Sequence, residues 1–257
     1  MNHYLFKLAR NDDEKHLIAR LDELVQKAVA GISGQSAFLD LRQQELARAV
    51  ATNEPSIAWH LDGGYEEAER KRCFVYPEWE TKADARIAYL RITPKLYLEQ
   101  SIGHRDYLGA VLNLGIKREK LGDIVVQNDQ AVLIVDVGMT EYICQQLSQV
   151  KHSIVEVDIV PRGQLVLRSP ELQVLSLSLA SLRLDAGVAA VFNLSRAEVD
   201  DLVSAGQIRI NQLQVYKGAV PIKVDDLISV RGRGRFRLEE VGGQSRKGRL
   251  RVQISRW

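Results

Sequence analysis

Stretches of distinct apolar periodicity divide the chain into four parts, of which the first is residues 1–84. Apolar side chains at helical spacing between Leu17 and Ala28 predict a first helix, which Gly31 is placed to end. Asp40 is a predicted N-cap for a second helix in LRQQELARAV. SIAWHLDGGYEEAERKRCFVYP then predicts two strands joined at a Gly-Gly turn. We expect this first part to form a small α/β region.

Residues 85–160 show a clearer succession of elements. ARIAYLRIT predicts a strand, HRDYLGAVLNLG a helix, and DIVVQ with AVLIVDV a hairpin around Asn128-Asp129. MTEYICQQLSQV adds a second helix and SIVEVDIVP a last strand. This β-α-β-β-α-β order predicts a ferredoxin-like domain, the arrangement of RRM-type RNA-binding modules. Because the aromatic RNP1 signature is missing, we expect RNA contacts there through loops and helix ends.

Residues 161–180 are predicted as a connector, in which leucines alternating with serines at 175–179 indicate a half-buried strand. Residues 181–257 then predict two short helices followed by a small sheet. Ser195 and Glu198 have the spacing of a capping box, and Gly206 is placed to end that helix in a left-handed conformation. The predicted fold class of the whole chain is therefore α+β.

Composition narrows the class of protein. Hydrophobic residues make up 46% and charged residues 26% of the chain, and no apolar run is long enough to span a membrane. Cys73 and Cys144 lie far apart, so we expect two free thiols in a reducing cytoplasm. The histidines show no ligand spacing with them, and we expect no metal and no cofactor.

The net charge of +2 conceals an asymmetry along the chain. Residues 181–257 hold 14 lysines and arginines against 8 acidic residues, whereas residues 1–180 hold the other 21 against 25. A basic excess confined to one small domain is typical of a polyanion-binding surface.

Four pieces of the last region, SLRLD, LSR, AGQIRIN and DDLISVRG, occur in the order and at the separations of the S4 RNA-binding domain, which the region resembles. At Ser195-Arg196, backbone N–H groups, the helix dipole and a guanidinium converge on one point, which suits a phosphate. In S4 domains such positions grip structured RNA by phosphate and shape. The candidate RNA-binding residues are Arg183, Ser195, Arg196, Arg209 and Asn211. Arg231 and Arg233 in RGRGRF either extend this surface or belong to a solvated strand edge.

The SIGHRD stretch at 101–106 allows two interpretations. A kinase catalytic loop requires an asparagine five residues after its aspartate, but Val111 stands five after Asp106. The remaining interpretation is a helix start that holds phosphate, with further cations at the other helix end in IKREK. The candidates are His104, Arg105, Lys117, Arg118 and Lys120. Solvated charges flanking a core helix are the alternative.

GGYEEAERKR, GHRDYLGAVLNLGIKREKLGDIVVQ and SLRLDAGVAAVFNLSR together resemble the YlmH family of S4-domain proteins. The first half is closest to the cyanobacterial branch, whose members carry the label photosystem II S4 domain protein. The resemblance implies a cytosolic RNA-binding protein that associates with the large ribosomal subunit, rRNA and tRNA. It also implies a connection with the rescue of stalled ribosomes and, in some bacteria, with cell division.

Two other function classes remain open. An RNA-modifying enzyme could dock through the S4 domain, because Arg183-Leu184-Asp185 is similar to the catalytic triplet of some pseudouridine synthases. Asp106 and Asp185 are the candidate acids, but neither has a visible partner, so we expect no enzyme. An adaptor in photosystem II assembly or cell division could use the N-terminal region, which holds 15 acidic against 11 basic residues in 1–84.

Overall fold

The computed structural model describes residues 4–80, 86–95, 102–127, 129–165, 167, 173–245 and 248–256. The chain divides into two compact units, Met1–Ser169 and Pro170–Trp257. All strand pairs among the described residues are antiparallel, and helices pack on one side of each of three sheets. The α+β prediction is therefore confirmed.

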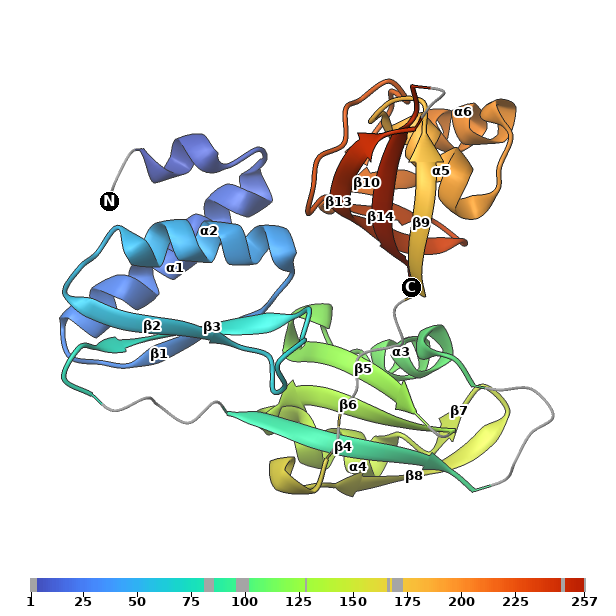
Figure 1. Cartoon of the computed structure of the whole chain (residues 1–257). Coiled ribbons are helices and arrows are strands. Elements are labelled where there is room, and N and C mark those ends of the chain that lie inside the picture. Colours follow the sequence, from blue (N-terminus) through green and yellow to red (C-terminus); the bar gives the residue numbers. More distant parts are fainter. Residues whose placement is uncertain are drawn as a thin grey trace. The chain divides into compact units, whose positions relative to one another are not determined.

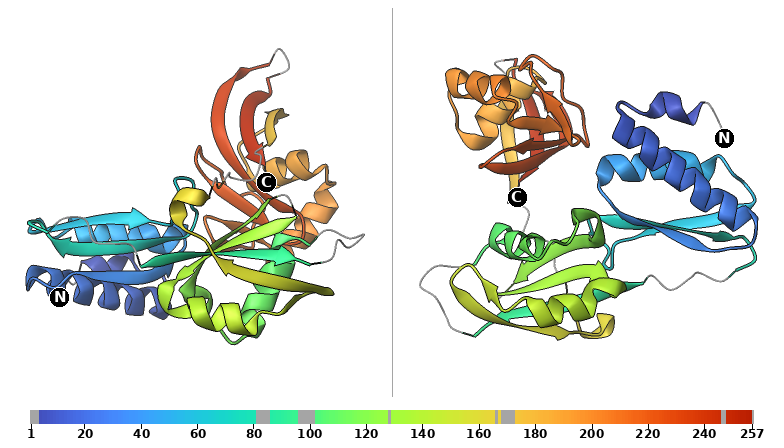
Figure 2. Two further views of the ribbon diagram at one scale, coloured as in Figure 1. Left: turned by 90° about the horizontal axis from the view of Figure 1, so that it is seen from below. Right: turned by 180° about the vertical axis from the view of Figure 1, so that it is seen from behind.

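The first sheet of unit one has the strand order β1-β3-β2. Its strands are β1 (Gly34–Leu39), β2 (Ile57–Asp62) and β3 (Lys71–Pro77). The helices α1 (Asp12–Val29) and α2 (Leu41–Thr52) cover one face of it (Figures 1 and 2). Strand β1 has no counterpart among the predicted elements, because GQSAFL is short and its partner lies more than thirty residues away along the chain.

The ends of α1 and α2 follow the predicted local signals. Gly31 has φ +87°, and the Ile32 N–H donates to the Lys27 carbonyl at 2.8 Å, so α1 ends in a left-handed cap. Asp40 accepts from the Gln43 N–H at 2.9 Å, while the Gln43 side chain accepts from the Asp40 N–H at 3.0 Å. This reciprocal capping box satisfies two donors that the helix itself leaves unpaired.

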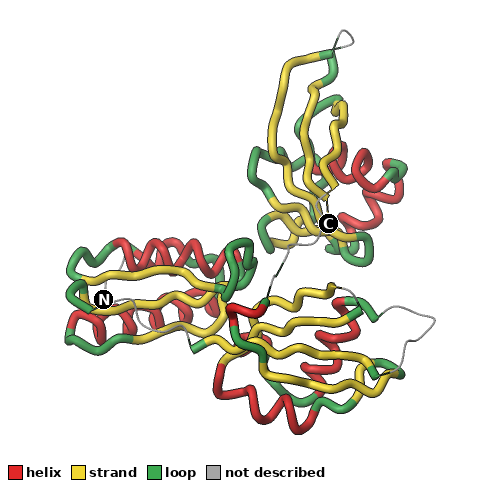
Figure 3. Tube along the Cα trace, turned by 60° about the horizontal axis from the view of Figure 1, so that its bottom comes forward, coloured by secondary structure: helices red, strands yellow, loops and turns green. Residues whose placement is uncertain are grey.

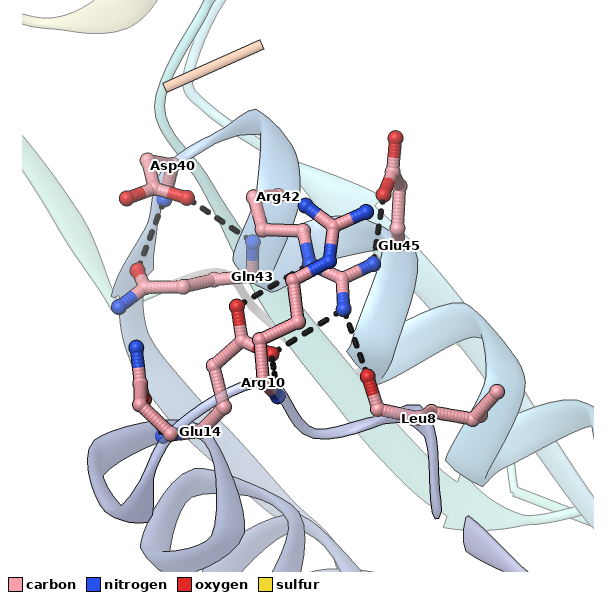
Figure 4. Close-up of polar contacts among 8 residues, drawn as sticks. Leu8, Arg10, Glu14, Asp40, Arg42, Gln43 and Glu45 are labelled. Atoms are coloured by element: carbon pink, nitrogen blue, oxygen red, sulfur yellow. Dashed lines mark hydrogen bonds and ion pairs between the residues drawn. The ribbon is translucent and has the colours of Figure 1, made fainter. Parts of the chain in front are cut away.

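A largely buried ion pair joins α1 to α2 (Figure 4). The Arg42 guanidinium donates to both Glu14 carboxylate oxygens at 3.1 Å and to the Leu8 carbonyl at 2.8 Å. The Arg10 N–H donates to Glu14 as well, at 2.9 Å. Because the Glu14 and Arg42 side chains are only 11% and 15% exposed, this cluster is largely shielded from solvent screening.

The second sheet of unit one has the order β5-β6-β4-β8-β7. The strands are β4 (Ile87–Pro94), β5 (Leu121–Gln127), β6 (Gln130–Asp136), β7 (Gln149–Val150) and β8 (Ser153–Ile159). The helices α3 (His104–Asn113) and α4 (Thr140–Gln146) pack on one face of it (Figure 3). Apart from the two-residue β7, the elements follow the predicted β-α-β-β-α-β order. Asn128 of the predicted hairpin turn lies outside the described residues, and Asp129 beside it has φ +60°.

Buried polar contacts tie the two sheets of unit one together. Arg72 donates to the Asp136 carboxylate at 2.9 Å and to the Arg86 carbonyl at 3.1 Å. The Tyr89 hydroxyl donates to the Gly64 carbonyl at 2.7 Å, and Arg70 bridges from the first sheet to the Leu121 carbonyl at 3.1 Å. The regions predicted as 1–84 and 85–160 therefore form one compact unit.

The sheet of unit two has the order β11-β10-β12-β13-β14-β9. Its strands are β9 (Gln173–Leu179), β10 (Ile208–Ile210), β11 (Leu213–Val215), β12 (Leu227–Val230), β13 (Gly234–Gln244) and β14 (Leu250–Arg256). The helices α5 (Leu184–Phe192) and α6 (Arg196–Ser204) pack against it through a core of their own. Strand β9 lies within the predicted connector 161–180 but pairs with β14, so this part of the connector belongs to unit two.

No helix of the described part of the chain is both long and apolar enough to cross a membrane. Cys73 and Cys144 are both unpaired, as the sequence predicted.

Candidate nucleic-acid interface

The start of α3 carries the HRD triplet on its first turn. His104 and Arg105 are exposed there. The Asp106 carboxylate accepts the Gly103 N–H at 2.9 Å and lies 3.9 Å from the Lys151 ammonium. Asp106 therefore has partners that explain it as a local cap, and its own charge opposes an anion at this end of the helix.

The cations of IKREK divide into structural and exposed ones. Arg118 donates to the Leu121 carbonyl at 2.8 Å and to the Gly122 carbonyl at 2.9 Å. Burial, helped by the charge of Arg70, lowers the pKa of Arg118 to about 10. Lys120 lies 3.6 Å from the Asp136 carboxylate, whereas Lys117 is exposed. Arg118 thus directs its donors inward and stabilises the turn before β5. Lys117 is the most accessible cation of this group.

In unit two the Arg183 side chain is engaged by a carboxylate. Arg183 is the N-cap of α5, and its Nε donates to Asp185 at 3.1 Å. This hydrogen bond lowers the pKa of Asp185 below its ordinary value, with burial opposing and the nearby charge of Arg196 adding to the effect. Asp185 therefore pairs with the neighbouring arginine, a partner that the sequence analysis had not identified. Arg196 itself is exposed on the first turn of α6.

Ser195 caps α6 through both of its polar groups. Its hydroxyl accepts from the Glu198 N–H at 3.3 Å, and its own N–H donates to the Glu198 carboxylate at 2.8 Å. The hydrogen bond from the Ser195 N–H lowers the pKa of Glu198, and the charge of Arg233 contributes to this shift. The capping box is as predicted. An acidic group, however, occupies the position where we expected phosphate.

Asn211 also has a structural role. Its amide donates to Asp226 at 2.8 Å and accepts from the Leu227 N–H at 2.9 Å, so it holds the β10–β11 turn against β12. Arg209 is exposed on β10 between Gln214 and Ser229 of the neighbouring strands. Arg231 and Arg233 are exposed in the turn between β12 and β13. The structure thus presents these three arginines to solvent and directs Asn211 inward.

The distribution of charge within unit two was missed by the sequence analysis. The helices α5 and α6 carry four carboxylates: Asp185, Glu198, Asp200 and Asp201. Their one arginine is Arg196, the first residue of α6. The strands and the β12–β13 turn carry most of the arginines: Arg209, Arg231, Arg233, Arg235, Arg237, Arg251 and Arg256. Charge counted element by element would have shown that the basic excess lies on the sheet and its turns.

A second feature that sequence reasoning missed is a groove beside α3. Arg105, Gly109 and Asn113 of α3 line it together with Lys151 from the β7–β8 turn. The available sequence signal for this groove was Gly109, a glycine within a predicted helix. Among the described residues, no cluster of three or more His, Cys, Asp or Glu side chains is arranged to hold a metal.

Comparisons with known proteins agree along most of the chain. Residues 83–163 match the family model described as "Putative RNA-binding domain in YlmH". Over 221 residues, 85% of each chain, the sequence is 31% identical to ribosome-associated protein quality control protein P2 of Bacillus subtilis (strain 168). Among solved structures, cell division protein ylmH from Streptococcus pneumoniae matches 61% of this chain and 96% of its own, with a TM-score of 0.50. At 18% identity this last likeness shows a shared fold.

The sequence motifs, the order of elements in the central sheet and a relative of 31% identity that spans most of both chains lead to one conclusion. The chain belongs to the YlmH family.

Proposed function

We propose that the protein is a non-enzymatic RNA-binding factor of the cytoplasm that acts on the large ribosomal subunit. It recognises structured rRNA and tRNA there, as part of translation or the quality control of stalled ribosomes. The observation that carries this proposal is the similarity along 85% of the chain to a protein named for ribosome-associated quality control. The arginines gathered on the strands and turns of unit two support it, because phosphate contacts provide most of the affinity of such factors.

Within unit two, which we propose to act as an S4-type RNA-binding domain, the exposed arginines form the best candidate surface. Arg196 is exposed on the first turn of α6, Arg209 is exposed on β10, and Arg231 and Arg233 are exposed in the β12–β13 turn. Such guanidinium contacts are expected to bind RNA largely without regard to sequence.

Sedimentation of tagged protein with cell lysate on a sucrose gradient, at low and moderate salt, tests this proposal. We expect the wild-type protein to co-migrate with the large subunit, and Arg196→Ala with Arg233→Ala to weaken this association about tenfold or more. The double variant Lys15→Ala/Lys27→Ala on α1 is the charge-matched control, because it removes two exposed cations from the acidic N-terminal region.

Two outcomes would contradict the proposal. Migration at the top of the gradient in both salts would exclude stable ribosome association. An equal loss for the Lys15/Lys27 double variant would show that the association depends on net charge alone and not on the surface of unit two.

A further inference from the structure

A groove of about 530 Å³ opens between α3 and the segment that runs from the end of α4 to the β7–β8 turn. From α3 it is lined by Arg105, Gly109 and Asn113, and from the other side by Gln146, Gln149 and Lys151. All of these residues belong to unit one and to the part of the chain that matches the family's RNA-binding domain.

Gly109 lines the groove and leaves the surface of α3 bare at this position. A Cβ built at Gly109 meets no atom within 4 Å, so close packing does not require glycine at this position. Gly187 of α5 differs in this respect, since a Cβ there would lie 3.1 Å from Ile222 and 3.4 Å from Phe236. A helix with glycine in its interior is less stable than the same helix with alanine at that position. At Gly109 no close packing contact compensates for this loss of helix stability. The missing side chain does, however, leave the surface of α3 bare.

Two cations and several amides line the groove. Arg105 is exposed and makes no ion pair with any described residue, while Lys151 lies 3.9 Å from Asp106, the one carboxylate of the lining. Lys151 has φ +56°, a left-handed conformation that β-branched and bulky residues rarely adopt, in the turn that brings it beside α3. The amides of Asn113 and Gln146 are both donors and acceptors, as the edges of nucleobases require. The Gln149 amide, in contrast, donates to the Lys151 carbonyl at 2.8 Å and adds an acceptor oxygen.

The opposite face of the same sheet does not suit RNA. RRM-type domains bind bases on their open sheet face. Here that face packs Tyr89 and Ile134 against Phe38, and it carries the exposed carboxylates Glu156 and Asp158 on β8. Because Tyr89 and Ile134 are buried against Phe38, this part of the open face is not accessible to bases, which favours the helix side of the domain.

We propose that the groove beside Gly109 binds an unpaired nucleotide of a structured RNA. Arg105 binds its phosphate, Lys151 offsets the charge of Asp106 beside it, and the amide side chains face its base over the bare surface of α3. This inference rests on the proposed RNA-binding function and adds to it a second contact, separate from the arginines of unit two.

The test uses the full chain and measures fluorescence anisotropy with two labelled RNAs, a hairpin with an unpaired loop and a blunt duplex of the same stem. Gly109→Gln places a side chain in the groove without changing its charge. It is expected to lower affinity for the hairpin about tenfold and to leave affinity for the duplex unchanged. The double variant Arg105→Ala/Lys151→Ala is expected to have the same effect.

Two matched controls separate the groove from general effects. Gly109→Ala adds only a methyl group, so it should raise the thermal midpoint and retain hairpin affinity. Arg91→Ala removes a cation from the opposite face of the sheet and should leave hairpin affinity unchanged. Thermal melting of all variants verifies that each is folded, and the double variant provides the answer if Gly109→Gln is not.

Each outcome decides between the two proposals. If the wild-type protein binds neither RNA at low salt, the proposed function itself is wrong. If the wild-type protein binds the hairpin and both groove variants bind it equally well, only the groove inference is overturned. Equal losses for hairpin and duplex would show that the groove contacts phosphate alone, which would also overturn the assignment of an unpaired nucleotide.

Discussion

Burial decides what each arginine of this chain can do. Arg70, Arg72 and Arg118 direct their donors to backbone carbonyls and to Asp136, and Arg42 binds Glu14. Arginine suits such partly buried positions because its planar donors match carbonyl and carboxylate oxygens and its charge persists. In a linear sequence these residues are indistinguishable from exposed arginines, and this is why Arg118 was predicted to contact RNA.

The Glu14–Arg42 cluster makes stability depend on pH in a specific window. Burial raises the pKa of Glu14, but hydrogen bonds from Arg42 and from the Arg10 N–H outweigh it, so the pKa lies below its ordinary value of 4.5. The charged form is therefore favoured by folding. Its stabilising contribution is present above the ordinary pKa and is lost as pH falls through the lowered folded pKa.

We predict that Glu14→Gln reduces the free energy of unfolding of unit one by about 1.5–3 kcal/mol at neutral pH. The difference from the wild-type protein should shrink as the pH falls from neutral to below the lowered folded pKa of Glu14, because the carboxyl is then neutral in both states. Urea unfolding across this pH range measures it. The control is Glu23→Gln, whose exposed pair with Lys27 should contribute nothing measurable. If the difference in unfolding free energy between Glu14→Gln and the wild-type protein persisted in acid, lost packing and not lost charge would be responsible.

At the scale of elements, helix ends were predictable because their signals are local. The N-cap Asp40, the capping box of Ser195 with Glu198, and the left-handed glycines at 31 and 206 all lie where the sequence predicted them. Strands β1, β13 and β14 were not predicted. Their bounds depend on pairing with segments distant in the chain, which neighbouring residues do not encode.

The capping geometry of α6 predicts that Ser195 acts on stability and not on RNA. Ser195→Ala should destabilise unit two by about 1 kcal/mol, because the Glu198 N–H loses its acceptor, while RNA affinity stays unchanged. Ser195→Asp, which restores a capping oxygen, should recover the stability. Thermal unfolding and anisotropy on the same samples measure both effects. A loss of RNA affinity in the alanine variant without a change in stability would instead assign the hydroxyl to RNA.

At the scale of the whole molecule, the two units have separate hydrophobic cores. Ile254, Phe236 and Val188 belong to the core of unit two, whereas Leu133 and Tyr107 belong to a core of unit one. Domains with separate cores can unfold independently, so a single two-state transition is not expected for this chain.

We predict that Ile254→Ala, which removes a fully buried side chain, destabilises unit two by about 2–5 kcal/mol and leaves unit one unchanged. Differential scanning calorimetry should then show one transition displaced to lower temperature and the other unmoved. The reciprocal control is Leu133→Ala, which should displace the other transition. A single transition displaced by both substitutions would indicate that the units unfold together.

The sequence by itself determined the α+β class, the succession of elements in the central sheet, the helix caps and the family, because periodicity, capping patterns and motifs are encoded by neighbouring residues. Tertiary structure alone decided that residues 1–84 and 85–160 form one unit, since their contacts join residues such as Arg72 and Asp136 that lie 64 positions apart. It also decided which cations are accessible, because burial depends on segments that meet only in the folded chain. The groove over Gly109 exists for the same reason, as α3 and the β7–β8 turn are adjacent in space and not in sequence.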